Sequence, residues 1–115
     1  MAFIDFNSKP PLKVWDGIEG PVAHSDKATF GHFTLQVGTL LPEHSHPNEQ
    51  WTHIIEGELE MNVGGEVQRL TPGMTAYIPG DVPHSGKVIT PCKVIDCFMP
   101  PREDFKIMAE EQNIA

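Results

Sequence analysis

Gly38-Thr-Leu-Leu-Pro-Glu-His44-Ser-His46-Pro-Asn-Glu-Gln50 is the stretch that decides the fold of this 115-residue chain. It places two histidines two positions apart and a glutamine four positions after the second. In an extended segment the side chains alternate between two faces, so His44 and His46 point to the same face and Gln50 shares their parity. Imidazole nitrogens and an amide oxygen are metal-ligand groups. The stretch therefore predicts part of a metal site.

Short segments with β-strand character follow one another along most of the chain. Leu59, Met61 and Val63 alternate with polar side chains, as expected for a strand with one buried face. Gly64-Gly65 then predicts a two-residue hairpin loop, because both glycines adopt positive φ easily. Further strands are predicted within residues 28–41, 50–55, 67–70, 75–78 and 93–99. With 11 prolines and ten glycines spread along the chain, this pattern predicts an all-β sandwich or barrel.

The composition narrows the domain count and the classes of partner. A chain of this length builds one hydrophobic core. The net charge of −8 argues against nucleic acid, whose phosphates require basic side chains. Apolar runs are too short for a membrane span and the N-terminus lacks a secretion signal, so we expect a cytoplasmic protein with no membrane partner. Cys92 and Cys97 are expected to be free thiols.

Two spaced motifs connect the histidine stretch to a known family. The pattern Gly38-x5-His44-x-His46-x3-Gln50-x6-Gly57 resembles the first cupin motif. The pattern Gly73-x5-Pro79-x-Asp81-x2-His84 resembles the second. The double match is far more specific than either motif alone. The chain thus resembles a small single-domain cupin.

This resemblance implies a fold and a division of the chain. The fold is a double-stranded β-helix, the jelly-roll barrel of cupins, which we expect over residues 21–102. Residues 1–20 are expected to form an N-terminal arm with short strands. Residues 103–115 are expected to form a C-terminal tail.

The resemblance also implies one divalent transition metal per chain inside the barrel. The implied ligands are His44, His46, Gln50 and His84. Imidazoles and an amide oxygen suit Zn, Ni, Fe, Co or Mn, so the donor set does not select among these metals. Gln50 replaces the family's more common glutamate and removes one negative charge from the shell. A less negative shell leaves the metal more electrophilic and better able to accept an anionic substrate. Asp81 stands where the second motif usually has glycine, which leaves the turn geometry there open.

The strand predicted at residues 93–99 carries a second group of candidate site residues. Val94, Asp96 and Phe98 share one face, and a carboxylate in an apolar strand is costly unless it is paired or functional. Pro100-Pro101 ends the strand, and Arg102, one of two arginines, follows at once. Asp96, Phe98 and Arg102 are therefore expected to line the barrel lumen and its mouth. The alternative is a structural ion pair between Asp96 and Arg102 at the rim.

The spacing Asp96-x-Phe98-x3-Arg102, together with Gln50, is similar to that of KdgF-type cupins from pectin and alginate degradation. Those proteins linearise 4,5-unsaturated monouronates to the open-chain keto sugar acid. The resemblance implies that Asp96 and Arg102 are catalytic, with Asp96 as the catalytic carboxylate. It further implies that Phe98 shapes the sugar pocket and that Arg102 binds the substrate carboxylate. The implied partner is a small anionic sugar acid.

Two other functions stay open on the sequence alone. One is a metal-dependent cupin dioxygenase that acts on a small organic acid and consumes oxygen. The other is a non-catalytic cupin that binds a metal or a sugar and forms no product.

A homodimer is also expected, because exposed β-edges and an apolar N-terminal segment containing Phe3, Ile4 and Phe6 need covering. His53 has the opposite parity to Gln50 and is expected at the surface or an interface.

Overall fold

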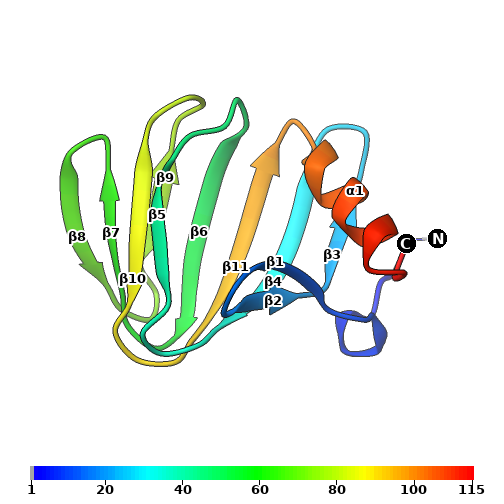
Figure 1. Cartoon of the computed structure of the whole chain (residues 1–115), viewed down its shortest axis with the longest axis horizontal. Helices are drawn as coiled ribbons and strands as arrows, with labels where there is room; N and C mark the ends of the chain where they lie inside the picture. Colours follow the sequence, from blue (N-terminus) through cyan, green and yellow to red (C-terminus); the bar gives the residue numbers. More distant parts are fainter. Residues whose placement is uncertain (1) are drawn as a thin grey trace.

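The computed structural model describes residues 2–115 and consists of two β-sheets with one α-helix at one end (Figure 1). The larger sheet has seven strands in the order β1-β2-β4-β11-β6-β9, with β3 also paired to β4. Its strands are β1 (Leu12–Trp15), β2 (Ile18–Gly20), β3 (Val22–His24), β4 (Thr29–Leu35), β6 (Glu49–Glu56), β9 (Thr75–Ile78) and β11 (Cys92–Met99). The smaller sheet has four strands in the order β5-β10-β7-β8. These are β5 (Leu40–His44), β7 (Leu59–Val63), β8 (Glu66–Leu70) and β10 (His84–Val88). The predicted all-β jelly-roll fold is confirmed.

The hydrophobic core lies between the two sheets. In β4, residues 29, 31, 33 and 35 are buried and the residues between them are exposed, which is the alternation of a strand with one face on the core. In β7, Leu59 and Met61 are both 5% exposed, as their parity predicts. The remaining core side chains come from both sheets and from the helix: Leu12, Ile18, Phe33, Leu35, Ile54, Leu70, Ile78, Val88, Cys92, Val94, Phe98 and Phe105.

Two tight connections depend on positive φ angles. Gly64 and Gly65, at φ +59° and +97°, join β7 to β8, and Val63 pairs with Glu66 across the loop. The predicted two-residue hairpin is therefore present. Asp81 also has a positive φ of 65°, which explains why glycine is usual at this position of the motif. The backbone N–H of Asp81 donates to the carbonyl of His46, so this turn is tied to the predicted metal-ligand stretch.

Strand β11 lies between β4 and β6, and its register sets the interior of the barrel. Phe98 is opposite Gln50, and Asp96 is opposite Thr52. Val94 and Phe98 are each 2% exposed, so the predicted shared face of Val94, Asp96 and Phe98 points inward. The pairing therefore brings the second group of candidate residues next to the first.

The short strands expected in the N-terminal arm of residues 1–20 are present, but they belong to the barrel and not to a separate arm. Residues 6–8 form a short 3-10 helix, η1 (Phe6–Ser8), but β1 and β2 join the larger sheet. Leu12, at 0% exposure, and Ile18, at 9%, are core residues, and their burial accounts for this pairing. The segment that lies outside the barrel therefore ends before Leu12.

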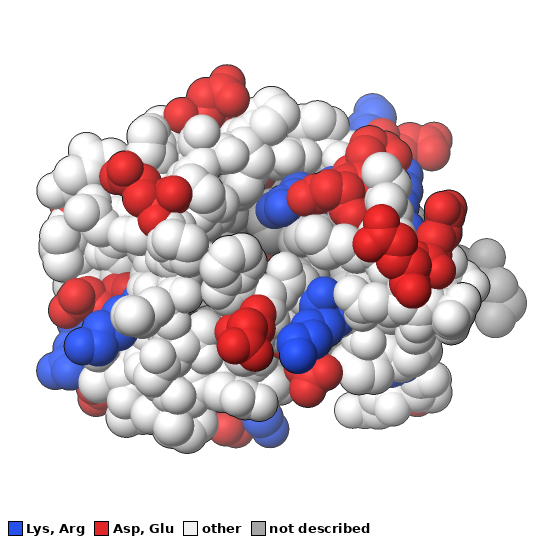
Figure 2. Space-filling model, in the orientation of Figure 1, with Lys and Arg blue, Asp and Glu red and all other residues white. Residues whose placement is uncertain are grey.

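The C-terminal segment forms the helix α1 (Glu103–Glu111), which packs beside β1 (Figure 1). The side chain of Gln112 bonds both the N–H and the carbonyl of Lys13 on β1, at 3.0 and 2.8 Å. Figure 2 shows acidic side chains gathered at this end of the molecule. Within residues 2–115, no helix is long and apolar enough to cross a membrane.

Candidate metal centre

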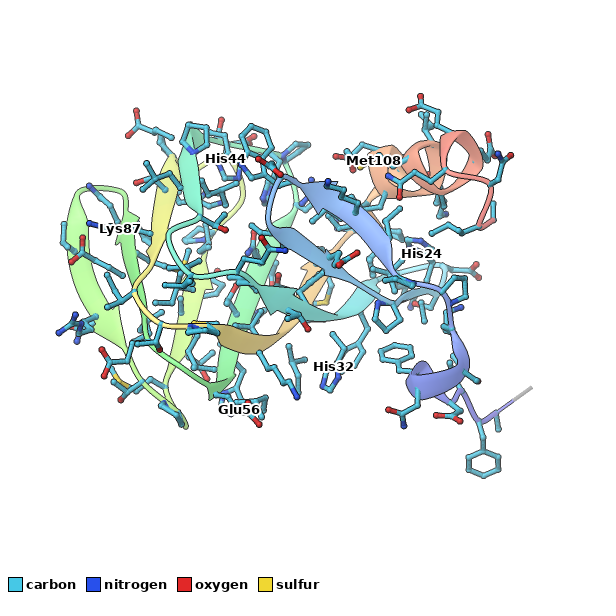
Figure 3. The ribbon with its side chains drawn as sticks, turned by 60° about the horizontal axis from the view of Figure 1, so that its bottom comes forward. His24, His32, His44, Glu56, Lys87 and Met108 are labelled. Carbon is cyan, nitrogen blue, oxygen red and sulfur yellow. The ribbon has the colours of Figure 1, made fainter. Side chains whose placement is uncertain are left out.

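Three histidines converge inside one end of the barrel. His44 ends β5, and His84, which begins β10, is its cross-strand partner. His46 lies in the loop between β5 and β6. One ring nitrogen from each of His44, His46 and His84 lies within 4.8 Å of the others, so the three side chains could hold one metal ion. Figure 3 shows His44 at the edge of the barrel that faces Met108 of α1.

Each of these rings is oriented by a backbone carbonyl. Nδ1 of His44 lies 2.8 Å from the carbonyl oxygen of Pro42. Nδ1 of His46 lies 2.9 Å from the carbonyl oxygen of Asn48. Nδ1 of His84 lies 2.9 Å from the carbonyl oxygen of Val82. A carbonyl only accepts, so each Nδ1 carries the proton. In the neutral ring this leaves the lone pair of Nε2 free for a metal, as in other histidine ligands whose second nitrogen donates to a carbonyl.

Burial favours the neutral imidazole at His46 and His84. His84 is 1% exposed and its Nε2 has no hydrogen-bond partner within the described residues. Burial lowers the pKa of His84 to about 4, against the opposing hydrogen bond to the Val82 carbonyl. Burial also lowers the pKa of His46, aided by the charge of Arg102. A metal ligand must be unprotonated, and both rings meet that condition at neutral pH.

Gln50 completes the group, and its geometry favours a cation. Its Nε2 donates to Oγ1 of Thr52 at 2.9 Å, and its Oε1 lies 3.0 Å from Nε2 of His46. Because Nδ1 of His46 carries the proton, two lone pairs face each other at that distance. Such a pair is repulsive unless a cation or an added proton lies between them. The donor set of three imidazoles and one amide oxygen therefore fits a divalent transition metal.

The cluster opens into a cavity of about 290 Å³ between the barrel and α1. Its lining includes His44, Gln50, Asp96, Phe98 and Arg102. Members of both groups of predicted site residues thus line one cavity, whereas His46 and His84 are not among its lining residues. Trp15 and Met108 also line this cavity, although nothing in their local sequence pattern indicated it.

Asp96 is an unusual carboxylate because Oδ1 is fully enclosed without a hydrogen-bond partner among the described residues. Burial raises the pKa of Asp96 to about 6, against the opposing effects of the Thr52 hydroxyl and of Arg102. A carboxyl group with a pKa near neutrality can both accept and release a proton. The position and the pKa of this group suit proton transfer.

Arg102 is held in place by α1 and by two aromatic rings. Its Nε and Nη2 donate to Oδ1 and Oδ2 of Asp104 at 2.9 and 2.8 Å. Its guanidinium carbon lies 4.7 Å from the ring centre of Phe98 and 4.1 Å from that of Phe105. These distances are within the range of cation–π contacts. Arg102 therefore pairs with Asp104, and no ion pair with Asp96 exists within the described residues.

Asn48 connects the metal-ligand loop to the segment before Arg102. Its carbonyl accepts from Nδ1 of His46, and its side-chain amide donates to the carbonyl of Pro100. The backbone N–H of Arg102 donates to Oγ1 of Thr29 at 2.8 Å. Asn48, Thr52 and Asp104 had no role predicted from the sequence. Asp104 could have been noticed, because it lies two residues after a scarce arginine.

The other histidines lie outside the cluster. Nδ1 of His53 lies 2.6 Å from Oγ1 of Thr75, and His24 bonds Thr29 in the same way. His32 packs against Phe6 on the outer face of β4. Cys92 and Cys97 are free thiols, as expected.

The family and the solved structures support the same interpretation. Residues 31–98 match the cupin domain family. The fold is similar to that of KdgF from Halomonas sp., with a TM-score of 0.83, 26% identity, and coverage of 90% of this chain and 97% of that chain. It is also similar to an RmlC-like cupin from Shewanella frigidimarina, with a TM-score of 0.85, 25% identity, and coverage of 91% and 96%.

Ectoine synthase from P. lautus shares the fold at a TM-score of 0.82 and 19% identity, over 96% of this chain and 86% of that one. A search of curated proteins finds no match to the sequence. The match to the family covers more than half of the chain and includes both spaced motifs. The chain therefore belongs to the cupin family.

Proposed function

We propose that this cupin linearises 4,5-unsaturated monouronates to open-chain keto sugar acids, as in pectin or alginate degradation. One observation carries the proposal: a fixed guanidinium and a carboxyl whose buried Oδ1 has no hydrogen-bond partner among the described residues line the same cavity as His44 and Gln50. The likeness to KdgF from Halomonas sp. is a second line of support. The substrate is an anion, and this cavity offers a cation to receive it.

Arg102 would bind the substrate carboxylate. Asp104 occupies Nε and one hydrogen of Nη2. Within residues 2–115 the Nη1 group and the second hydrogen of Nη2 have no partner. A guanidinium edge of this kind receives a carboxylate through two parallel hydrogen bonds. Phe98, below the guanidinium, would pack against the sugar ring. This local cation offsets the repulsion between an anionic substrate and a protein of charge −8.

The metal-ligand group would supply a Lewis acid. Held by His44, His46, Gln50 and His84, a divalent metal would polarise a substrate oxygen. The amide of Gln50 is neutral and adds no negative charge to this group. A glutamate at position 50 would repel an anionic substrate, and Gln50 does not.

Asp96 would move the proton. Its carboxylate accepts the proton of the anomeric hydroxyl while the bond between C1 and the ring oxygen breaks, which produces the aldehyde. The electron pair of that bond stays on the former ring oxygen as an enol or enolate. A proton delivered to C4 then converts the enol to the ketone. The reaction is an isomerisation, so atoms and electrons balance without a redox partner.

The decisive experiment is an assay of unsaturated galacturonate and its alginate counterpart with metal-loaded protein. Loss of the enol-ether absorbance, with the keto product identified by NMR, is the expected result. Asp96→Asn should mainly lower kcat, and Arg102→Ala should mainly raise KM. If Asp96→Asn consumed the enol ether at the wild-type rate, the catalytic assignment would be wrong.

The same preparation separates the alternatives. Elemental analysis identifies the bound metal. Oxygen consumption with a small organic acid would indicate a dioxygenase instead. Saturable sugar binding without product would indicate a non-catalytic cupin.

A further inference from the structure

Gln50 and Thr52 lie two positions apart on β6 and share its inward face. They are 9% and 3% exposed, which is the alternation expected of a strand with one face on the core. Nε2 of Gln50 donates to Oγ1 of Thr52 at 2.9 Å. The pairing of β6 with β11 places Asp96 opposite Thr52. Thr52 therefore lies between a predicted metal ligand and the buried carboxyl.

The amide of Gln50 has two possible orientations, and only one of them suits a metal. In the observed orientation Oε1 lies 3.0 Å from Nε2 of His46, so the amide oxygen faces the metal-ligand group. If the amide were turned over, its NH2 group would donate to the lone pair of His46 and occupy it. Without a metal, the turned amide would also remove the repulsion between the two facing lone pairs. A further contact must therefore hold the amide in the orientation that binds a cation.

The hydroxyl of Thr52 supplies that contact because its one proton is directed elsewhere. A hydroxyl both donates and accepts, so Thr52 by itself could pair with either side of the amide. Burial raises the pKa of Asp96 to about 6, and a hydrogen bond from the Thr52 hydroxyl opposes that rise. A carboxylate only accepts. Once the hydroxyl proton points to Asp96, Oγ1 presents only lone pairs to Gln50, and only the NH2 side of the amide fits.

The surroundings of these side chains offer the amide few other partners. Gln50, Thr52 and Asp96 line a small cavity of about 60 Å³ whose other walls are mostly aliphatic. A buried amide N–H without a partner is unfavourable. Loss of the Thr52 hydroxyl would therefore favour the turned amide, which places its NH2 group against His46.

We propose that Thr52 is a positioning residue for metal binding: its hydroxyl donates to Asp96 and accepts from Gln50, and this keeps Oε1 of Gln50 directed at the metal-ligand group. The proposal does not depend on which substrate the cavity binds. Removal of an outer partner that orients a metal ligand commonly lowers metal affinity by about 10- to 100-fold.

Competition titrations against a chelating dye, with Zn²⁺ as the probe, test the proposal. Thr52→Val keeps the shape of the side chain but removes the hydroxyl, and it should weaken Zn²⁺ binding by about tenfold. Thr52→Ser keeps a hydroxyl and should restore most of the affinity. Thr75→Val is the matched control, because it removes a hydroxyl that bonds His53 outside the cluster. It should leave the affinity unchanged, and circular dichroism verifies that each variant is folded.

A double-mutant cycle separates orientation of the amide from packing. Both ends of a carboxylate are oxygens, so Gln50→Glu presents an oxygen to the metal in either orientation. Thr52→Val should therefore weaken Zn²⁺ binding much less in the Gln50→Glu background than in the wild-type background. An equal loss in both backgrounds would mean that Thr52 acts only through packing, and it would overturn the proposal.

A second readout uses metal-free protein. The side-chain NH2 signals of Gln50 are identified by their absence from the NMR spectrum of Gln50→Glu. They should move in Thr52→Val and stay in place in Thr75→Val. Unmoved signals in Thr52→Val, or a folded Thr52→Val protein with wild-type affinity for Zn²⁺, contradict the role of Thr52. A wild-type protein that binds no Zn²⁺ contradicts the metal centre as well.

Discussion

Asp104 holds the guanidinium of Arg102 through two hydrogen bonds of 2.9 and 2.8 Å, at the first turn of α1. The same guanidinium also lies over the rings of Phe98 and Phe105, at 4.7 and 4.1 Å from their centres. The side chain of Arg102 is 13% exposed, so its orientation is fixed before any ligand arrives. Asp104 is therefore a positioning residue for the cation at the cavity.

Asp104→Asn should raise KM for the unsaturated uronate by roughly tenfold, since about 1.4 kcal/mol of binding corresponds to that factor. The neutral amide keeps one acceptor but loses the paired charge that aligns Arg102. The value of kcat should change little, because among the described residues the side chain of Asp104 bonds Arg102 and neither the metal-ligand group nor Asp96. Glu103→Gln, one residue away and paired with Lys106, is the matched control and should leave KM unchanged.

NMR of the Arg102 Nε–H group provides a readout that does not depend on the proposed reaction. Its resonance should move in Asp104→Asn and stay in place in Glu103→Gln. If wild type and Asp104→Asn had the same KM and the same Arg102 Nε–H resonance, Asp104 would not be a positioning residue.

Gln50→Glu should bind the metal more tightly and the anionic substrate more weakly. A carboxylate replaces the amide oxygen that faces Nε2 of His46, so a cation gains roughly tenfold in affinity, or about 1.4 kcal/mol. The added charge also repels the substrate carboxylate. Metal competition titrations and KM measurements test the two effects. Gln68→Glu, on exposed β8, adds the same charge elsewhere and should change neither quantity.

His84→Ala should abolish stoichiometric metal binding, whereas His53→Ala should not. His84 is 1% exposed with its Nε2 free among the described residues, but His53 bonds Thr75 outside the cluster. Elemental analysis of the two purified variants, with circular dichroism to verify folding, makes the comparison. Full metal content in folded His84→Ala would exclude His84 as a ligand.

The sequence predicted many of the strands and their inward side chains because both depend on local alternation, but it did not predict β10 (His84–Val88) or β5 (Leu40–His44) as separate strands. The burial of Leu59, Met61, Val94 and Phe98 follows from their parity alone. At His46, alternation along a strand does not set the direction of the side chain. That residue lies in a loop between β5 and β6, and its ring is directed by the carbonyl of Asn48.

The parts of the site that the sequence did not reveal depend on contacts between distant segments. Asn48 donates to a carbonyl 52 residues away, and no local pattern encodes that contact. The strands β1 and β2 were expected within an arm, because short segments with few apolar residues give little sign of which sheet they join. Their place follows from the burial of Leu12 and Ile18 against the core.

Asp96 should make the metal-free protein less stable as pH rises through the acid range. Its pKa is raised from 3.8 to about 6 in the folded state. Between these values the folded protein binds more protons than the unfolded chain, so the free energy of unfolding falls with increasing pH. The stabilisation contributed by neutral Asp96 is fully lost above about pH 6. A pKa shift of about two units corresponds to roughly 3 kcal/mol in the free energy of unfolding.

Asp96→Asn removes this titration, so the variant should gain stability relative to wild type as pH rises from about 4 to above 6. His84 acts with the opposite sign, because its pKa is lowered to about 4 and its contribution is lost as pH falls below 6.5. Since His84 is present in both proteins, its effect cancels in the difference. Denaturant unfolding of metal-free protein across this range measures that difference. A difference that does not vary with pH would mean that Asp96 is solvated or paired in solution, and the proton-transfer role would lose its physical basis.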